Sequence, residues 1–226
     1  MDFSCHSHRF GERLLKEEYL GLQREIFDVI GDNNDEDIIQ QHERFHAKQK
    51  SISMALNDLF KSRFTGLGWQ AESPIFQDPE YSSGREKVWR LDFAKDAVSI
   101  EVAYNHGDAL AWNLLKPVLA SELNHVEKAI QTDLGVVILA TEGLKEAGGF
   151  DGAVGTYEKA IRYLQPLRAQ LTVPLVLIGL MAPVSFTMEQ TRRSDGRGVV
   201  GEIVRFKEMR PMSSDENTNS PSFWSL

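Results

Sequence analysis

Two carboxylates in the segment LDFAKDAVSIEVAYNHG, residues 91–107, stand where a plain β-strand would place neither. Asp92 lies in one short apolar run and Glu101 near the end of the next, with Lys95 and Asp96 between the runs. The runs KVWRLDFA and AVSIEVAY predict two antiparallel strands joined by a tight turn. Such a hairpin can bring both carboxylates to one site.

Paired carboxylates in a cleft suit Mg²⁺, which binds one or two carboxylates together with waters and phosphate oxygens. An ion held in this way activates water and stabilises negative charge on a phosphodiester. The pair alone does not decide the matter, because carboxylates at strand ends commonly form turns or surface ion pairs.

The rest of the chain predicts the elements that position this hairpin. Helical spacing of apolar residues predicts helices over residues 10–30, 35–64, 108–132 and 152–170. In the third of these, Pro117 marks a kink or a break. The runs LGVVILAT and VPLVLIGLMA are typical of strands buried on both faces. Alternating strands and helices predict an α/β fold, with a central mixed sheet and helices on both faces.

Length and composition favour one soluble domain, since the chain has 226 residues with 42% hydrophobic content. We expect a single domain with an N-terminal helical portion over residues 1–210, followed by a mobile Ser/Asn-rich tail at 211–226. No run approaches the roughly 18 apolar residues of a membrane span, and the N-terminus lacks a signal-peptide core. Cys5 is the single cysteine, so a cytoplasmic location is expected.

The net charge of −8 argues against a general nucleic-acid coat, because nonspecific phosphate binding depends on Lys and Arg. A locally basic cleft remains compatible with this total. The basic residues near the C-terminus are Arg192, Arg193, Arg197, Arg205, Lys207 and Arg210. Loose clusters of this kind are usually a solvated face.

Other motifs point to chemistry less well. HERFH, residues 42–46, matches the zinc-peptidase pattern H-E-x-x-H, but no third ligand is evident, which favours a solvated helix with two exposed imidazoles. His6 and His8 read most simply as a frayed terminus. The glycines of GGFDGAVGTYEK lack the Gly-Lys-Ser/Thr ending of a P-loop and favour a flexible loop before a helix.

The segment LDFAKDAVSIEVAYNHG resembles the catalytic hairpin of type II restriction endonucleases of the BglII and BstYI group, within the PD-(D/E)xK nuclease superfamily. The resemblance continues through LNDLFKSRFTGLGWQAE before it, and through SELNHVEKAIQTDLGVVILAT and VPLVLIGLMAP after it. It covers about residues 55–183. Agreement in order and spacing makes it more specific than the short motif, and it implies a restriction-endonuclease-like core.

This resemblance implies roles for the hairpin residues. Asp92 is then the principal metal-binding carboxylate and Glu101 the second, with the carbonyl of Val102 also facing a Mg²⁺ ion. Glu72 corresponds to a helper position upstream of the hairpin. Position 103 belongs to the same catalytic set.

The resemblance also implies a homodimer on double-stranded DNA, each subunit cutting one strand of a palindrome with a GATC centre. A DNA methyltransferase acting on the same site is the corresponding partner. Base-reading residues are implied in the turn after the catalytic strand, which here is Asn105, His106 and Gly107. Phosphate contacts are expected from Arg192, Arg193 and Arg197.

One departure matters. Where relatives carry Glu-x-Gln, Glu-x-Lys or Glu-x-Glu, this chain has Glu101-Val102-Ala103, and a methyl group neither orients water nor donates a hydrogen bond. Either the chemistry manages without that group, a neighbour such as Glu72 replaces it, or cleavage is slowed or lost. We therefore expect slow cleavage and a gain on Ala103→Gln.

Three hypotheses follow. The first is a Mg²⁺-dependent, sequence-specific type II DNA endonuclease. The second is a DNA-binding module that keeps the nuclease fold without the cut. The third is an unrelated α/β protein whose carboxylates form surface ion pairs. Metal-dependent nicking separates the first from the second, and duplex binding separates both from the third.

Overall fold

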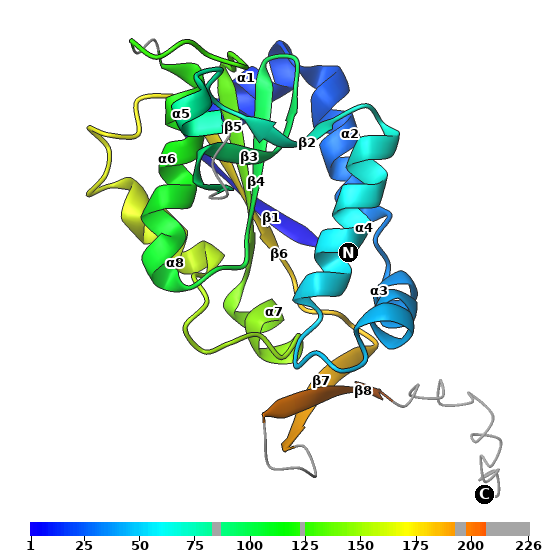
Figure 1. The fold of residues 1–226 in the computed structure, drawn as a ribbon. Coiled ribbons are helices and arrows are strands. Elements are labelled where there is room, and N and C mark those ends of the chain that lie inside the picture. The colour runs from blue at the N-terminus through cyan, green and yellow to red at the C-terminus, as the bar shows by residue number, and fades with distance from the viewer. Residues whose placement is uncertain (83–86, 123–124, 193–197, 207–226) are drawn as a thin grey trace, which may run out of the picture.

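The computed structural model describes residues 1–82, 87–122, 125–192 and 198–206, so the tail predicted at 211–226 lies outside the described part (Figure 1). Its centre is a six-stranded sheet in the order β1-β6-β5-β4-β3-β2. The strands of this sheet are β1 Phe3–His8, β2 Gln70–Pro74, β3 Arg90–Lys95, β4 Val98–Ala103, β5 Leu134–Ala140 and β6 Leu175–Leu180.

The sheet is mixed, as predicted. Strands β4, β5 and β6 run parallel, while β1, β3 and β2 pair antiparallel with their neighbours. Every residue of β5 and β6 is buried, which explains their continuous apolar runs, because helices cover both faces of these central strands.

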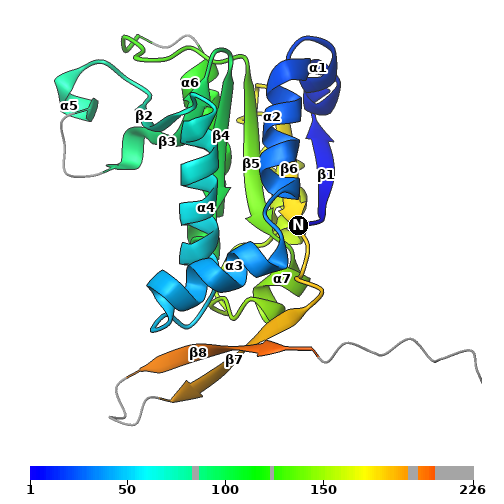
Figure 2. The ribbon, with the colours of Figure 1, turned by 90° about the vertical axis from the view of Figure 1, so that its right-hand side faces the viewer.

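Helices lie on both faces of the sheet, which confirms the predicted architecture (Figure 2). One face carries α1 Gly11–Glu17, α2 Leu20–Gly31 and α4 Ser53–Gly66. The other carries α6 Leu110–Ser121 and α8 Tyr157–Leu164. Helices α3 Asp35–Gln41, α5 Pro79–Ser82 and α7 Glu142–Ala147 lie outside these two layers.

The helices are shorter than their apolar spacing predicted. The first predicted helix divides at Tyr19 into α1 and α2. The second consists of α3, a π-helical turn at His42–His46 and α4. The third ends at Ser121, where the serine hydroxyl donates to the carbonyl of Pro117 at 2.9 Å. The fourth is α8 alone, which begins only after Thr156 has capped the backbone N–H of Lys159. Side-chain hydrogen bonds thus set ends that apolar periodicity does not mark.

The N-terminus is a strand, so the prediction of a frayed terminus at His6 and His8 was wrong. Residues Phe3–His8 pair antiparallel with β6 along the whole of β1. The His8 ring is buried, and its Nε2 lies 2.9 Å from the carbonyl oxygen of Leu171. The polar side chains of β1 leave no apolar alternation that would predict a strand; they are tolerated because this edge strand stays partly exposed.

A second hairpin was not predicted at all. It consists of β7 Phe186–Arg192 and β8 Val199–Arg205, which pair only with each other. Figure 2 shows it beyond the end of the main sheet, beside α3. Arg205 joins it to that helix through an ion pair with Glu36 at 2.7 Å.

In the described residues, no helix is long and apolar enough to cross a membrane.

A glycine on β5 tests the packing of α6 on the sheet. A Cβ at Gly135 would overlap the ring of Pro117 and come within 2.8 Å of Leu175 Cδ2. We expect Gly135→Ala to lower the free energy of unfolding by about 2 kcal/mol, the usual cost of overpacking. Gly21→Ala is the control, since nothing lies within 4 Å of its added Cβ in helix α2. Urea unfolding of both variants checks this, and equal stability of the two would contradict it.

Candidate active site

The two carboxylates lie where β3 and β4 separate. The predicted hairpin is confirmed, but its backbone pairing stops at Phe93 and Ile100. Beyond this point, side-chain carboxylates replace backbone carbonyls as acceptors. The backbone N–H of Val102 donates to Asp92 Oδ2 at 2.7 Å, and the backbone N of Asp92 lies 3.4 Å from Glu101 Oε1. Each carboxylate therefore accepts a hydrogen bond that the regular ladder would have used, which explains acidic residues inside apolar strands.

We call the place where β3 and β4 separate, with Asp92 on one strand and Glu101 on the other, the fork. Burial dominates the electrostatics of this fork. Glu101 is 1% exposed. Burial, and then the charge of Asp92, raise the pKa of the Glu101 carboxyl to about 8, although the ammonium of Lys116 acts in the opposite direction. Lys116 forms an ion pair with Glu101 Oε2. Two carboxylates held this close form a site that a cation stabilises.

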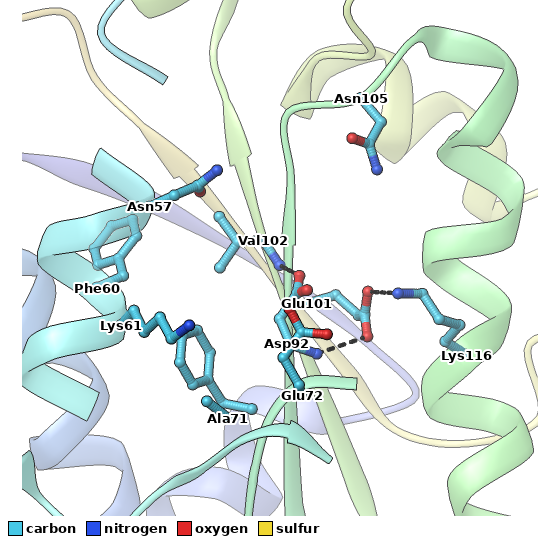
Figure 3. Close-up of a pocket in the computed structure, with 11 residues that line it drawn as sticks. Asn57, Phe60, Lys61, Ala71, Glu72, Asp92, Glu101, Val102, Asn105 and Lys116 are labelled. Atoms are coloured by element: carbon cyan, nitrogen blue, oxygen red, sulfur yellow. Dashed lines mark hydrogen bonds and ion pairs between the residues drawn. The ribbon is translucent and has the colours of Figure 1, made fainter. Parts of the chain in front are cut away.

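A pocket of about 240 Å³ opens over the fork. Figure 3 shows helix α4 on one side of it, helix α6 on the other and the hairpin of β3 and β4 between them. The residues around it are Asn57, Phe60, Lys61, Ala71, Glu72, Asp92, Phe93, Glu101, Val102, Asn105 and Lys116. Four residues predicted from the hairpin and its turn, Asp92, Glu101, Val102 and Asn105, thus share one pocket with Glu72, the residue predicted as a helper.

Glu72 reaches the pocket from β2 with an unusual backbone. Its φ is 53°, in the left-handed region that non-glycine residues seldom occupy. The pairing of β2 with β3 skips this residue, going from Ala71–Phe93 to Ser73–Leu91. Such strain is kept where the surrounding structure holds a side chain in a needed direction. Here the side chain is held beside the fork (Figure 3).

Ala103 does not line the pocket. It is 2% exposed and packs in an apolar cluster with Leu110 and Leu114 of α6. Ala103 and Glu101 share one face of β4, since residues two apart on a strand point to the same side. On this face the chain therefore presents Glu101, with a buried methyl group as its neighbour.

The predicted base-reading turn is fixed by a second loop. The backbone N–H of Gly107 donates to the Ala153 carbonyl at 2.7 Å, and that of Gly155 donates to the Asn105 carbonyl at 3.0 Å. His106 forms a backbone bridge with Val154. The side chains of Asn105 and His106 are exposed, whereas Gly107 is buried. The glycine-rich segment is a loop that leads into α8, as predicted, and two backbone hydrogen bonds also join it to this turn.

The basic residues near the C-terminus are only partly described. Arg192 is exposed at the end of β7. Arg193, Arg197, Lys207 and Arg210 lie outside the described residues. The two described members, Arg192 and Arg205, lie at the ends of β7 and β8, and neither of them lines the pocket.

The motif HERFH does not form a zinc site. His42 is 2% exposed, so the prediction of two exposed imidazoles was wrong. His46 Nε2 contacts Asp58 Oδ2 at 2.7 Å. A π-helical turn carries the motif, and it does not provide the regular spacing that places two histidines on one helix face. In the part of the chain that the structure describes, no group of three or more His, Cys, Asp or Glu side chains is placed to hold a metal ion.

The fork nevertheless fits Mg²⁺ better than a softer metal. Its donors are oxygens, and it offers two carboxylates at one end of a pocket large enough for waters or phosphate oxygens. Mg²⁺ keeps several waters and needs only one or two protein carboxylates, so a cluster of three acidic ligands is not required. Asp92 and Glu101 are the residues that would hold it.

Sequence reasoning missed three polar residues at this pocket: Asn57 and Lys61 of α4, and Lys116 of α6. Only Lys116 carries a signal in the sequence, because it is the one cation within the apolar helical run LAWNLLKPVLA. Its partner Glu101 lies on another element, so the pairing needed the fold.

Comparison with known proteins agrees with this geometry. The profile of the family described as restriction endonuclease BglII/BglIII matches residues 3–180. The crystal structure of restriction endonuclease BglII complexed with a DNA 16-mer is similar with a TM-score of 0.62 at 16% identity, covering 91% of this chain and 100% of that chain. Free BglII gives a TM-score of 0.52 at 15% identity over the same shares. No curated protein matches the sequence.

The profile spans all six strands of the central sheet and the fork between β3 and β4. The solved structures agree with it in fold over most of this chain. The chain therefore belongs to the BglII restriction endonuclease family of type II site-specific deoxyribonucleases.

Proposed function

We propose that this chain is a Mg²⁺-dependent endonuclease that cuts both strands of duplex DNA at a palindrome with a GATC centre. The observation that carries the proposal is the fork itself, where Asp92 and Glu101 converge in one pocket under the exposed turn at Asn105 and His106. One surface of the protein would then contact the DNA backbone at the pocket and the base edges at the turn.

The residues divide the work as follows. Asp92 and Glu101 would hold the ion, which would stabilise charge at the scissile phosphate and activate water. Val102 fixes Asp92 through its backbone N–H. In the reaction a water oxygen bonds to phosphorus as the bond to the 3′ oxygen breaks. The water loses one proton to solvent and the 3′ oxygen gains one, so the products are a 5′-phosphate and a 3′-hydroxyl.

The turn residues Asn105, His106 and Gly107 are assigned to base reading. Two exposed polar side chains can donate to and accept from base edges. The loop at Ala153–Gly155 holds the backbone of the turn through two hydrogen bonds, which limits the freedom lost on binding. Glu72 is assigned to positioning at the fork.

A second candidate function is a DNA-binding module that has lost or slowed cleavage. The observation that favours it is Ala103, which brings no polar group to the face of β4 that carries Glu101. This candidate predicts sequence-specific duplex binding without nicking under any divalent ion.

Digestion of plasmid DNA tests both candidates. Unmethylated and GATC-methylated plasmid are incubated with the protein, with and without Mg²⁺. Discrete fragments that need Mg²⁺ and disappear on GATC methylation would support the endonuclease, its site and a methyltransferase partner acting on that site. Specific binding without fragments would replace it with the binding module.

We expect the protein to be a homodimer, because a palindromic duplex presents two equivalent strands to two equivalent sites. Analytical ultracentrifugation at micromolar concentration, with and without duplex DNA, measures this directly. A monomer that persists in both conditions would refute the expectation.

A further inference from the structure

Lys116 is buried at the active-site pocket. Lys116 is 8% exposed and lies among apolar residues in the middle of helix α6. Burying an ammonium group costs free energy unless it is paired and hydrogen-bonded. Its partner is Glu101, one of the two carboxylates of the fork, and the close pairing is visible in Figure 3.

The hydrogen bonds of Lys116 leave one direction for the pocket. An ammonium has three N–H donors. Within the described residues, its acceptors are Glu101 Oε2 and the Arg90 carbonyl oxygen, the latter at 3.1 Å. The third N–H has no acceptor among these residues, and Lys116 lines the pocket.

After Glu101, strand β4 offers no further polar side chain on this face. Ala103 follows Glu101 on the same face of β4, and its methyl group is enclosed by leucines of α6. Helix α6 packs on this same face, and Lys116 is the α6 side chain that reaches the carboxylate.

We propose that Lys116 is a catalytic residue that donates a hydrogen bond and a positive charge to the attacked phosphate from helix α6, while its ion pair orients Glu101. This inference rests on the proposed function. A donor fixed before the reaction stabilises charge that develops in the transition state without reorganisation. It also accounts for a strand that carries alanine at position 103.

The test separates metal binding from chemistry. In Lys116→Met, the positive charge beside Glu101 is gone, so Mn²⁺ measured by calorimetry should bind at least as tightly as in the native protein. Single-turnover cleavage at saturating metal should fall about 10²-fold, the usual effect of losing one such donor. Lys116→Gln keeps an N–H donor without the charge and should cut at an intermediate rate.

Lys95→Met is the matched control, because Lys95 also pairs with a glutamate, Glu25, at 2.8 Å, but outside the pocket. It should lower stability and leave the cleavage rate of folded protein unchanged. If Lys116→Met cuts at the native rate, or if it loses metal binding and cleavage in parallel, the proposal is overturned. Should Lys116→Met not fold, Lys116→Gln gives the same comparison, and a native rate there also overturns it.

A double variant adds an independent readout. Ala103→Gln should increase cleavage more in the Lys116→Met background than in the native chain, since the two groups serve one purpose. Equal gains in both backgrounds would contradict the inference. A native chain that neither binds Mn²⁺ nor cuts would overturn the proposed function itself, and this inference with it.

Discussion

Asp92→Ala is expected to abolish cleavage of duplex DNA while the protein stays folded. The variant removes one of the two carboxylates at the fork, and with it the main charged ligand proposed for the ion that stabilises the phosphate. The loss of rate should exceed that of any other single substitution considered above. Nicking of supercoiled plasmid at saturating Mg²⁺ measures it.

The effect on stability should be small because two contributions oppose each other. Asp92→Ala loses the 2.7 Å hydrogen bond from the Val102 backbone N–H, which contributes about 1 kcal/mol. It also removes the negative charge that disfavours ionised Glu101. Asp92→Asn keeps the shape of the side chain and should be equally inactive.

Asp37→Ala is the control for this experiment. Asp37 is also partly buried and bonds Arg63 at 2.7 Å, but it lies away from the pocket. It should lower the melting temperature and leave the nicking rate of folded protein intact. If Asp92→Ala behaves in the same way, active but less stable, then Asp92 is only a structural residue of the hairpin and the metal site is elsewhere.

The hairpin and the buried strands were predictable because their sequence patterns are local. Alternation around Lys95 and Asp96 is sufficient for an antiparallel pair, and continuous apolar runs indicate β5 and β6. The mixed sheet with helices on both faces follows from the alternation of these elements. The pairing of Asp92 and Glu101 was predictable for the same reason, since both lie on one hairpin.

The contacts that depend on distant segments were not predictable. β1 is a strand because β6 offers it an edge, and nothing in FSCHSH reveals that partner. Hydrogen bonds to the loop at Ala153–Gly155 hold the backbone of the turn at Asn105–Gly107. The glycines of that loop predicted a flexible segment and gave no sign of this contact. Lys116 belongs to the site only because α6 packs against the face of β4 that carries Glu101.

DNA affinity is expected to fall steeply with salt despite a net charge of −8. Binding releases counterions in proportion to the phosphates that Lys and Arg neutralise, so local contacts decide the salt dependence. Arg192 lies exposed on a hairpin that projects beyond the sheet (Figure 2). Arg193 follows it directly in the sequence, and Arg197 precedes β8.

Replacing Arg192, Arg193 and Arg197 together by alanine should make the slope of log affinity against log salt shallower by about 2.7, or about 0.9 for each lost phosphate contact. The control replaces three exposed arginines elsewhere in the chain, Arg13, Arg24 and Arg168, and changes the net charge by the same amount. Fluorescence anisotropy with a labelled duplex at several salt concentrations gives both slopes. An unchanged slope in the first variant would mean that the hairpin does not face DNA. Equal changes of slope in the two variants would assign the effect to net charge, because a local contact with DNA would change the slope of the first variant alone.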